Sequence, residues 1–532
     1  GNLGSSTVID LTLTQIAEIV GGRIDGIDPG DAARVRVTGT VEFDSRAVSP
    51  GGLFLALPGA RSDGHDFAAA AIESGAVAVL AARPVGVPSI VVPPAPAADA
   101  HAGVLEHDSG GAGAAVLAAL ARLAAAVATA LVADGLRIVG ITGSSGKTST
   151  KDLVAAVLRP LGEVVAPPGS FNNELGLPWT VLRATRDTDF LVLEMSARHP
   201  GNIAELARIA PPSIAVVLNV GTAHLGEFGS REVIATTKAE LVQAVPAAGV
   251  AVLNADDPVV AAMAARTAAR VVTVGRSDDP DSRADVRAVD VRLDELARPS
   301  FSLLAAGSAT PVRLAVHGEH QVGNALSAAA VALECGAAPE QVAAALSGAA
   351  PASRHRMEVR TRADGVTVIN DAYNANPDSM RAGLQALAVM ARQSGGGSGQ
   401  VSGAAPRRSW AVLGEMGELG EDSITEHDRI GRLAVRLDIS RLVVVGTGRP
   451  MSAMYHGAVM EGSWGSEAVM VADTDAALEL LRSVMRPGDV VLVKASNAAV
   501  MSALAEKLAA ESTMRPQAED ERGDLTPQDP IG

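Results

Sequence analysis

The chain has 532 residues, of which 60 are acidic and 44 are lysine or arginine, and its formal net charge is −16. The length predicts roughly three to four domains, and the acidic balance argues against a protein that binds duplex nucleic acid over a broad surface. Apolar residues make up 48% of the sequence and aromatic residues 2%. We therefore expect cores of Ala, Val, Leu and Ile, and we exclude a disordered or collagen-like protein.

Cys335 is the only cysteine, which excludes an intrachain disulfide and a metal site built from several cysteines, and which fits a reducing compartment. We expect Cys335 itself to be a small buried hydrophobic residue. The N-terminal stretch lacks the basic-then-apolar order of a signal peptide, so we expect no secretion signal and a cytoplasmic location.

Residues 8–133 predict a first, small α/β domain. Short apolar runs at 39–43 and 53–57 indicate strands, and a stretch rich in Gly, Pro and Ala at 87–113 indicates a linker. The apolar run 116–133 repeats its large residues at steps of three and four. That spacing predicts an amphipathic helix and not a membrane span.

Residues 134–350 predict a central domain with a more regular pattern. Buried-strand runs alternate with helical stretches, which indicates a parallel sheet covered on both faces. The predicted strands are 138–141, 190–193, 214–218 and 250–253. A segment of shorter, polar-alternating runs follows at 290–316, and helices are expected near 321–334 and 340–346.

Residues 351–512 predict a third α/β unit of the Rossmann-like type. Its expected strands are 366–369, 410–413, 442–445 and 490–493. A Gly/Ser insert at 394–403 predicts a flexible surface loop. The polar and charged tail, 513–532, is expected to be disordered.

A small-residue loop joins the predicted strand 138–141 to a helix start, which is the arrangement that binds phosphate. Its glycines let backbone amides turn inward, Lys147 can reach terminal phosphates, and the Thr148 hydroxyl can bind Mg²⁺. The predicted nucleotide-binding residues of this loop are Thr142, Gly143, Ser144, Ser145, Gly146, Lys147 and Thr148. Ile141 stands where the common P-loop has glycine, so the match is to a shorter relative. The alternative is a Gly/Ser turn that happens to carry a lysine. It is disfavoured because the loop lies between a predicted strand and a helix start, and because the chain has only five lysines.

Polar residues follow two neighbouring central strands, at the edge where a doubly wound sheet binds ligands. Glu194 directly follows one strand and His224 lies shortly after the next, so both are candidates to hold a metal. Lys238 lies on a predicted helix at 230–245, and the ordinary interpretation of this residue is a surface ion pair with Glu240 or a neighbour.

The third unit contributes a polar loop, because Asp371, Tyr373, Asn374 and Asn376 follow its first strand. Such a loop is a ligand-binding position, although Asn and Asp also form ordinary turns there. Arg354 and Arg356 lie between the second and third units, where an arginine can contact a phosphate as domains close.

Together these motifs resemble the Mur ligase family, the ATP-dependent amide-forming enzymes of peptidoglycan precursor synthesis. The resemblance covers about residues 8–510. Within the family, the chain is most similar to the member that acts on D-alanyl-D-alanine. The motifs that carry it are Phe43-Asp-Ser-Arg-Ala-Val-Ser-Pro-Gly-Gly-Leu-Phe54, Asp63-Gly-His65, Thr142 to Thr148, Asn172-Asn-Glu-Leu-Gly-Leu-Pro178, His317-Gly-Glu-His-Gln-Val-Gly-Asn324 and Asp371-Ala-Tyr-Asn-Ala-Asn-Pro377. It implies a three-domain architecture with a UDP-binding N-terminal domain, a central P-loop-type sheet domain and a Rossmann-like C-terminal domain.

The resemblance also implies residue roles. Lys147 would contact the ATP phosphates, Thr148 and Glu194 would bind one Mg²⁺, His224 would bind a second, and Lys238 would carry a CO₂-derived carbamate that supports the metal. The other implied ATP-binding residues are Asn324, Arg356 and Asp371. The implied substrate-binding residues are Ser45, Arg46, Asn172, Asn173, Arg198, His199, Tyr373, Asn374 and Asn376.

The implied reaction joins D-alanyl-D-alanine to UDP-N-acetylmuramoyl-tripeptide through an acyl phosphate, and gives the pentapeptide, ADP and phosphate. A monomer without nucleic acid or stable membrane insertion is expected, and the third residue of the tripeptide, lysine or diaminopimelate, stays open. The chain departs from many relatives at Lys494-Ala-Ser-Asn497, where they carry Lys-Gly-Ser-Arg.

Three alternatives are weighed against this reading. A sister ligase that adds a single amino acid and a folylpolyglutamate synthetase are both disfavoured by the segment 373–377. A P-loop kinase or nucleotide-binding regulator would leave Glu194, His224 and Lys238 unexplained.

Overall fold

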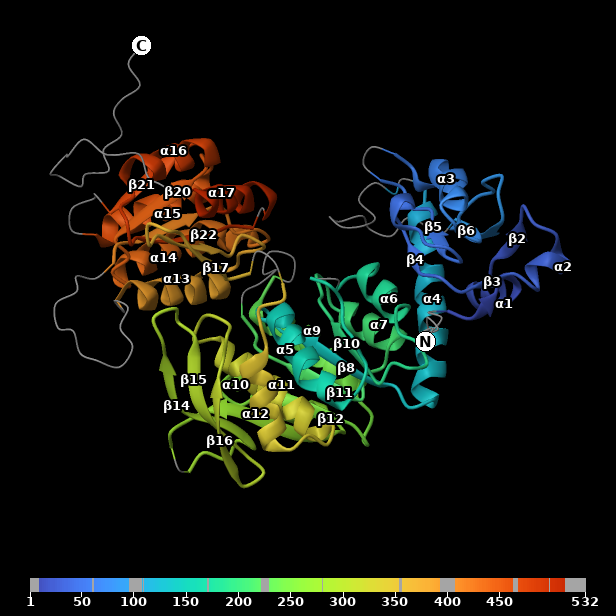
Figure 1. The fold of residues 1–532 in the computed structure, drawn as a ribbon, viewed down its shortest axis with the longest axis horizontal. Coiled ribbons are helices and arrows are strands. Elements are labelled where there is room, and N and C mark those ends of the chain that lie inside the picture. Colours follow the sequence, from blue (N-terminus) through green and yellow to red (C-terminus); the bar gives the residue numbers. More distant parts are fainter. Residues whose placement is uncertain are drawn as a thin grey trace, which may run out of the picture.

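The computed structural model places three α/β bodies along the chain (Figure 1). It describes residues 9–59, 62–94, 108, 110–169, 172–221, 229–279, 281–353, 356–392, 407–462, 467–496 and 498–511. The predicted flexible insert at 394–403 and the predicted disordered tail at 513–532 lie outside these residues.

The first body is built on a five-stranded sheet of order β2-β7-β6-β5-β4, in which only β2 is antiparallel to its neighbour. Its elements are β1 (Leu11–Thr12), α1 (Leu13–Val20), β2 (Arg23–Asp25), α2 (Pro29–Ala32), β3 (Arg36–Val37), β4 (Val41–Glu42), η1 (Ser45–Ala47), β5 (Leu53–Leu55), η2 (Gly64–Phe67), α3 (Ala68–Glu73), β6 (Ala78–Ala81) and β7 (Ser89–Val91). The strands predicted at 39–43 and 53–57 are present but shorter. The predicted linker is wrong at its start, because β7 lies inside it and is fully buried in the sheet.

The predicted apolar helix is confirmed as α4 (Ala112–Ala133). Of the residues in its three-and-four repeat, Leu117, Leu120, Ala124 and Leu131 are buried. They pack α4 against α1 of the first body and against two helices of the central body. By length and composition α4 is the one helix of the described chain that could cross a membrane, and half of its most apolar window is buried inside the structure.

The central body is a nine-stranded sheet of order β16-β15-β14-β13-β12-β11-β8-β10-β9, parallel from β9 to β14 and antiparallel beyond. Its elements are β8 (Arg137–Thr142), α5 (Lys147–Leu158), η3 (Arg159–Leu161), β9 (Val164–Val165), α6 (Gly176–Val181), β10 (Phe190–Glu194), α7 (Asn202–Ile209), β11 (Ile214–Val217), α9 (Arg231–Ala244), β12 (Val250–Asn254), α10 (Pro258–Ala261), η4 (Ala262–Arg266), β13 (Arg270–Arg276), β14 (Val286–Leu293), β15 (Pro299–Ala305), β16 (Ser308–Arg313), α11 (Gln321–Glu334) and α12 (Pro339–Gly348).

Alternate residues of the central strands enter two different cores. Ile138 and Leu191 pack with α7 and α9, whereas Val139 and Val192 pack with α5, α11 and α12. The predicted parallel sheet with both faces covered is therefore confirmed. Cys335 ends α11 and is half-buried, so the expectation that it is buried is only partly met.

The third body is a six-stranded sheet of order β17-β18-β22-β19-β20-β21, with only β17 antiparallel. Its elements are β17 (Glu358–Thr361), β18 (Thr367–Asn370), α13 (Pro377–Arg392), β19 (Ser409–Leu413), η5 (Gly420–Asp422), α14 (Ser423–Arg436), β20 (Arg441–Val445), α15 (Arg449–Glu461), β21 (Ala468–Val471), α16 (Thr474–Val484), β22 (Val490–Lys494) and α17 (Ala498–Ala510). Helices α13 to α15 cover one face and α16 and α17 the other, which confirms the predicted α/β unit.

The sheet register brings the functional segments to one edge of the central body. In the parallel strands, Ile141 pairs with Glu194 and Thr142 pairs with Val217. The loops that follow β8, β10 and β11 therefore leave the sheet side by side. In Figure 1 the third body lies next to this region, beyond α5.

Candidate active site

The phosphate loop has the predicted strand–loop–helix form, since β8 leads directly into it and α5 begins at Lys147. Gly146 has a φ of +88°, and a Cβ at this position would lie 2.8 Å from Asn324 Oδ1 on α11. Both the left-handed backbone and the close packing therefore require glycine here. The Lys147 Nζ donates to the Gly143 carbonyl over 2.7 Å, so the lysine folds back over its own loop.

Asn219, directly after β11, fixes the loop from the neighbouring strand. Its Oδ1 accepts from the Ser145 N–H over 3.0 Å, and its Nδ2 donates to the Ser145 carbonyl over 3.0 Å. The Asn219 carbonyl accepts from the Ser144 N–H over 3.2 Å. Asn219 was not among the predicted site residues, although its position after a strand next to β8 was the available signal.

Thr148 and Glu194 lie in contact beside the loop, as expected of two residues that would bind the same Mg²⁺. The Thr148 Oγ1 donates to Glu194 Oε1 over 2.9 Å, and both side chains are buried. Within the described residues, Glu194 Oε2 has no hydrogen-bond partner. Burial raises the pKa of Glu194, while the cations of Lys151, Lys147 and Arg356 oppose that rise. A buried, unpartnered carboxylate oxygen beside a threonine hydroxyl fits the oxygen ligands that Mg²⁺ prefers.

Lys238 on α9 points into the protein and is only 3% exposed. The alternative of a surface ion pair with Glu240 is wrong, because Glu240 accepts from the N–H groups of Gly201 and Ala204 at the start of α7. Burial, with the positive charge of Lys147 adding to it, lowers the pKa of Lys238 to about 7. Its amine is therefore readily uncharged near neutral pH. His224 lies outside the described residues.

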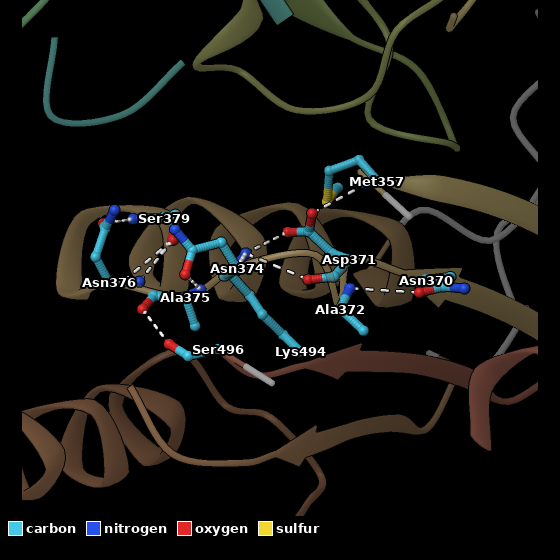
Figure 2. A network of polar contacts seen from close by, with 10 residues as sticks. All are labelled: Met357, Asn370, Asp371, Ala372, Asn374, Ala375, Asn376, Ser379, Lys494 and Ser496. Carbon is cyan, nitrogen blue, oxygen red and sulfur yellow. Dashed lines mark hydrogen bonds and ion pairs between the residues drawn. The ribbon is translucent and has the colours of Figure 1, made fainter. Parts of the chain in front are cut away.

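The polar loop of the third body is held by Lys494 at the end of β22 (Figure 2). Its Nζ lies 2.7 Å from Asp371 Oδ2 and donates to the Asn374 carbonyl over 3.0 Å. The other Asp371 oxygen accepts from the Met357 N–H over 3.1 Å. Ser496 donates to the Ala375 carbonyl over 2.8 Å, so the loop is fixed from two sides.

Asn376 connects this loop to the central body. Its Oδ1 accepts from the Ser379 N–H over 2.9 Å and so caps α13, while its Nδ2 donates to the Ser144 carbonyl over 3.4 Å. Asn376 thus forms a helix cap and also contacts the phosphate loop. The loop also carries Tyr373, and the Arg356 guanidinium lies 4.2 Å from the centre of its ring. Arg354 lies outside the described residues.

The remaining predicted substrate residues lie before α6 and after β10 in the central body, or in the first body. Asn173 Oδ1 accepts from the N–H groups of Leu175 and Gly176 before α6, and the Asn172 carbonyl accepts from Ser196. Arg198 forms an ion pair with Glu418 of the third body over 3.3 Å.

His199 lies beside Arg198, and its N–H donates to Asn202 Oδ1 over 2.8 Å. Ser45 and Arg46 lie in η1 of the first body, where the largely exposed Arg46 pairs with Asp44. They are therefore not part of the cluster around the phosphate loop.

The departure from the family pattern at Ala495 has a local counterpart. A Cβ on Gly414 would lie 2.6 Å from the Ala495 Cβ. With alanine at 495, the neighbouring strand end therefore has to carry glycine. Asn497 lies outside the described residues.

A strand–loop–helix phosphate site whose open side is met by a second α/β body is the arrangement of a multidomain nucleotide-dependent enzyme. Three family models match the chain in the order of its bodies. "Mur ligase family, catalytic domain" matches residues 39–127, "Mur ligase middle domain" matches 141–332, and "Mur ligase, glutamate ligase domain" matches 355–497. The chain belongs to the Mur ligase family, and it is an ATP-dependent ligase.

Individual relatives agree with the family models. The UDP-N-acetylmuramoyl-tripeptide–D-alanyl-D-alanine ligase of Mycobacterium tuberculosis is 72% identical over 95% of this chain and 99% of that protein. The crystal structure of MurF from Acinetobacter baumannii has a TM-score of 0.77 at 28% identity, covering 94% of this chain and 99% of that one. MurF ligase from Thermotoga maritima, solved with ADP, has a TM-score of 0.69 at 28% identity, covering 89% and 97%. The expected three-domain Mur ligase architecture is confirmed.

Proposed function

We propose that this chain joins D-alanyl-D-alanine to UDP-N-acetylmuramoyl-tripeptide and produces UDP-N-acetylmuramoyl-pentapeptide, ADP and phosphate. The observation that carries the proposal is the meeting of two bodies at the phosphate loop. Asn376 donates to the Ser144 carbonyl there, and the positive charge of Arg356 acts to lower the pKa of Lys147 and of Glu194. An enzyme that activates a carboxylate on one body and delivers an amine from another needs such a junction. The 72% identity to a ligase of this name supports the choice of substrates.

The first chemical step is attack of the tripeptide carboxylate on the γ-phosphate of ATP, which forms an acyl phosphate and releases ADP. Because both reactants are anions, their charges have to be neutralised. Lys147 and the N–H groups of the phosphate loop do this, and the loop is already held in place by Asn219. The dipeptide amine then attacks the acyl carbonyl, and phosphate leaves.

Thr148 and Glu194 would hold one Mg²⁺, which supplies further neutralisation of phosphate charge when it is bound. His224 and a carbamate on Lys238 would hold a second ion. The support from this chain is the pKa of Lys238, about 7, because CO₂ adds only to an uncharged amine.

The other assignments extend this reading. Asn324, Arg356 and Asp371 would bind ATP, and the ribose would share the Asp371 carboxylate with Lys494. The muramoyl-peptide and dipeptide would contact Asn172, Asn173, Arg198, His199, Tyr373, Asn374 and Asn376, and the uridine end would contact Ser45 and Arg46.

We propose domain limits at 8–133, 134–350 and 351–512. The contacts of α4 with both the first and the central body show how closely the first two units pack. A monomeric, cytoplasmic protein without stable membrane insertion completes the proposal.

The proposal is tested by phosphate release from ATP and Mg²⁺ with UDP-N-acetylmuramoyl-tripeptide and one amine at a time. We expect sustained release with D-alanyl-D-alanine and little with D-alanine or L-amino acids. Release with a single amino acid would identify a sister ligase. Release that is independent of any amine would identify a kinase or another nucleotide hydrolase.

A further inference from the structure

Lys151, one turn after Lys147 on α5, is a charged residue that the reaction above does not use. It is 2% exposed, and its Nζ donates to the Pro167 carbonyl over 2.7 Å. The Nζ also lies 2.7 Å from Asp152 Oδ1. A buried ammonium group costs considerable free energy unless it is paired, so Asp152 is held at this position by its neighbour.

The second oxygen of the same carboxylate contacts the segment that follows the central body. Asp152 Oδ2 accepts from the Ser353 Oγ over 2.5 Å, and Ser353 belongs to the segment between the central and third bodies. With Lys151 on one oxygen and Ser353 on the other, the Asp152 carboxylate has a fixed orientation. Charge-assisted hydrogen bonds of this kind are stronger than those between neutral groups.

The interdomain segment is therefore bound at two nearby points. Ser353 is held on the central body by Asp152, and the Met357 N–H is held on the third body by Asp371. Arg356 lies between them and stacks on Tyr373. Three peptide units span at most about 11 Å, so the hydrogen bond at Ser353 restricts where the Arg356 guanidinium can lie.

A narrow cleft lies beside this segment. It is lined by Asp152, His317, Gln321, Ser353 and Arg356. Ser149, two residues after Lys147 on α5, lines the same cleft as Arg356. The segment thus delivers a cation to the site where the phosphates are proposed to bind.

We propose that Asp152 is a positioning residue for the reaction, which fixes the interdomain segment through Ser353 and thereby places Arg356 beside the phosphate loop. The inference rests on the proposed ATP-dependent ligation, and it assigns a role to Asp152 and Ser353, which the reaction above does not use. It predicts that the Asp152–Ser353 contact affects nucleotide binding and turnover of ATP but not recognition of the dipeptide.

The test compares Ser353→Val with Ser353→Thr, which have the same shape and differ in the hydroxyl. Ser353→Val should raise the KM for ATP and the Kd for ADP about tenfold, as expected for loss of a hydrogen bond to a charged group. It should leave the KM for D-alanyl-D-alanine within about twofold, and Ser353→Thr should restore ATP binding. Thr129→Val, which removes an exposed hydroxyl contact on α4, serves as the control.

Asp152→Asn extends the test, although it also removes the carboxylate that pairs with Lys151. The part of its effect that runs through Ser353 should be absent in the Ser353→Val background, so Asp152→Asn should raise the KM for ATP less there than in the wild type. A KM for ATP and a Kd for ADP that are unchanged from the wild type in Ser353→Val would overturn the proposal. An equal rise of all KM values with a lower melting temperature would also overturn it, since that indicates a structural role.

Turnover of the wild type with D-alanyl-D-alanine, measured in the same plates, tests the proposed function separately. If the wild type ligates and Ser353→Val is unaffected, only the positioning role fails. If the wild type fails to ligate, the proposed function fails, whatever the ADP titration shows.

Discussion

Lys147 is the residue on which phosphate binding depends most directly. We expect Lys147→Ala to lower phosphate release by about 100-fold or more, the magnitude known for removal of a group that stabilises developing charge. Release of phosphate at saturating substrates is the measurement, and Lys507→Ala, at an exposed position on α17, is the control. Full activity in Lys147→Ala would show that the loop does not bind phosphate.

Lys238 gives a prediction with a pH dependence. We expect Lys238→Ala to lose activity and acetate to restore part of it, because acetate supplies the carboxylate that the carbamate would provide. The uncharged fraction of the Lys238 amine falls as the pH drops through about 7. Wild-type activity should therefore fall more between pH 8 and pH 6 than the acetate-restored activity of Lys238→Ala, which has no amine to titrate.

Initial rates at fixed acetate and CO₂ check this expectation, and the same two pH values are used for both proteins. Full activity of Lys238→Ala without acetate would remove the carbamate from the account. Identical pH profiles for the two proteins would contradict the role of the amine.

At the residue scale, the sequence predicted types of residue better than their partners. Thr148 and Glu194 were expected to meet and do so, because the parallel register brings the loops after neighbouring strands together. A surface position for Lys238 could not be excluded from the sequence, because the pattern of one helical stretch does not show which of its polar residues are buried. Asn219 and Asp152 were missed because their contacts are 74 and 201 residues away in the chain.

At the scale of elements, the start of α13 approaches the phosphate loop because Gly221 has no side chain. A Cβ on Gly221 would overlap Asp378 Oδ2 on α13, and the Gly221 N–H donates to Ser144 Oγ over 2.8 Å. We expect Gly221→Ala to displace the Asp378 side chain at the start of α13 and to lower kcat, because small misplacements beside a reacting site slow the reaction. The melting temperature should change little, because the cores of the bodies are untouched.

The control for this prediction is Gly348→Ala, at an exposed glycine where a Cβ meets nothing within 4 Å. Steady-state rates and thermal unfolding of both variants are compared with the wild type. Wild-type kcat in Gly221→Ala would show that the position of the Asp378 side chain beside Gly221 does not matter during turnover.

Strands and helices were largely predictable, since long apolar runs with clear periods formed β8, β10, β18, β22 and α11. The miss at β7 has a physical reason. Its three residues are flanked by glycine and proline, so the local pattern indicates a linker, and only pairing with β6 and β2 makes a strand.

At the scale of the whole molecule, both ion pairs and hydrogen bonds join the bodies within the described residues. Arg183 and Glu42 lie 3.8 Å apart between the first and central bodies, and Arg198 and Glu418 lie 3.3 Å apart between the central and third bodies. Partly exposed ion pairs contribute about 1 kcal/mol or less each. The apolar packing of α4 against the first and central bodies adds to these contacts.

The relative placement of the bodies was not predictable from the sequence, because it depends on such contacts between distant segments. The three α/β units and the phosphate loop were predictable, since each follows from local pattern and short-range turn chemistry. The family resemblance supplied the substrates, which no residue pattern in this chain could have identified by itself.

The central claim is that the chain adds a dipeptide and not a single amino acid. Mass spectrometry of the nucleotide product, formed from UDP-N-acetylmuramoyl-tripeptide and ATP with D-alanyl-D-alanine and D-alanine present together, tests it most directly. The account predicts a product heavier by one alanyl-alanine unit, formed in step with ADP. A product that carries a single alanine, or ADP without any heavier product, would contradict it.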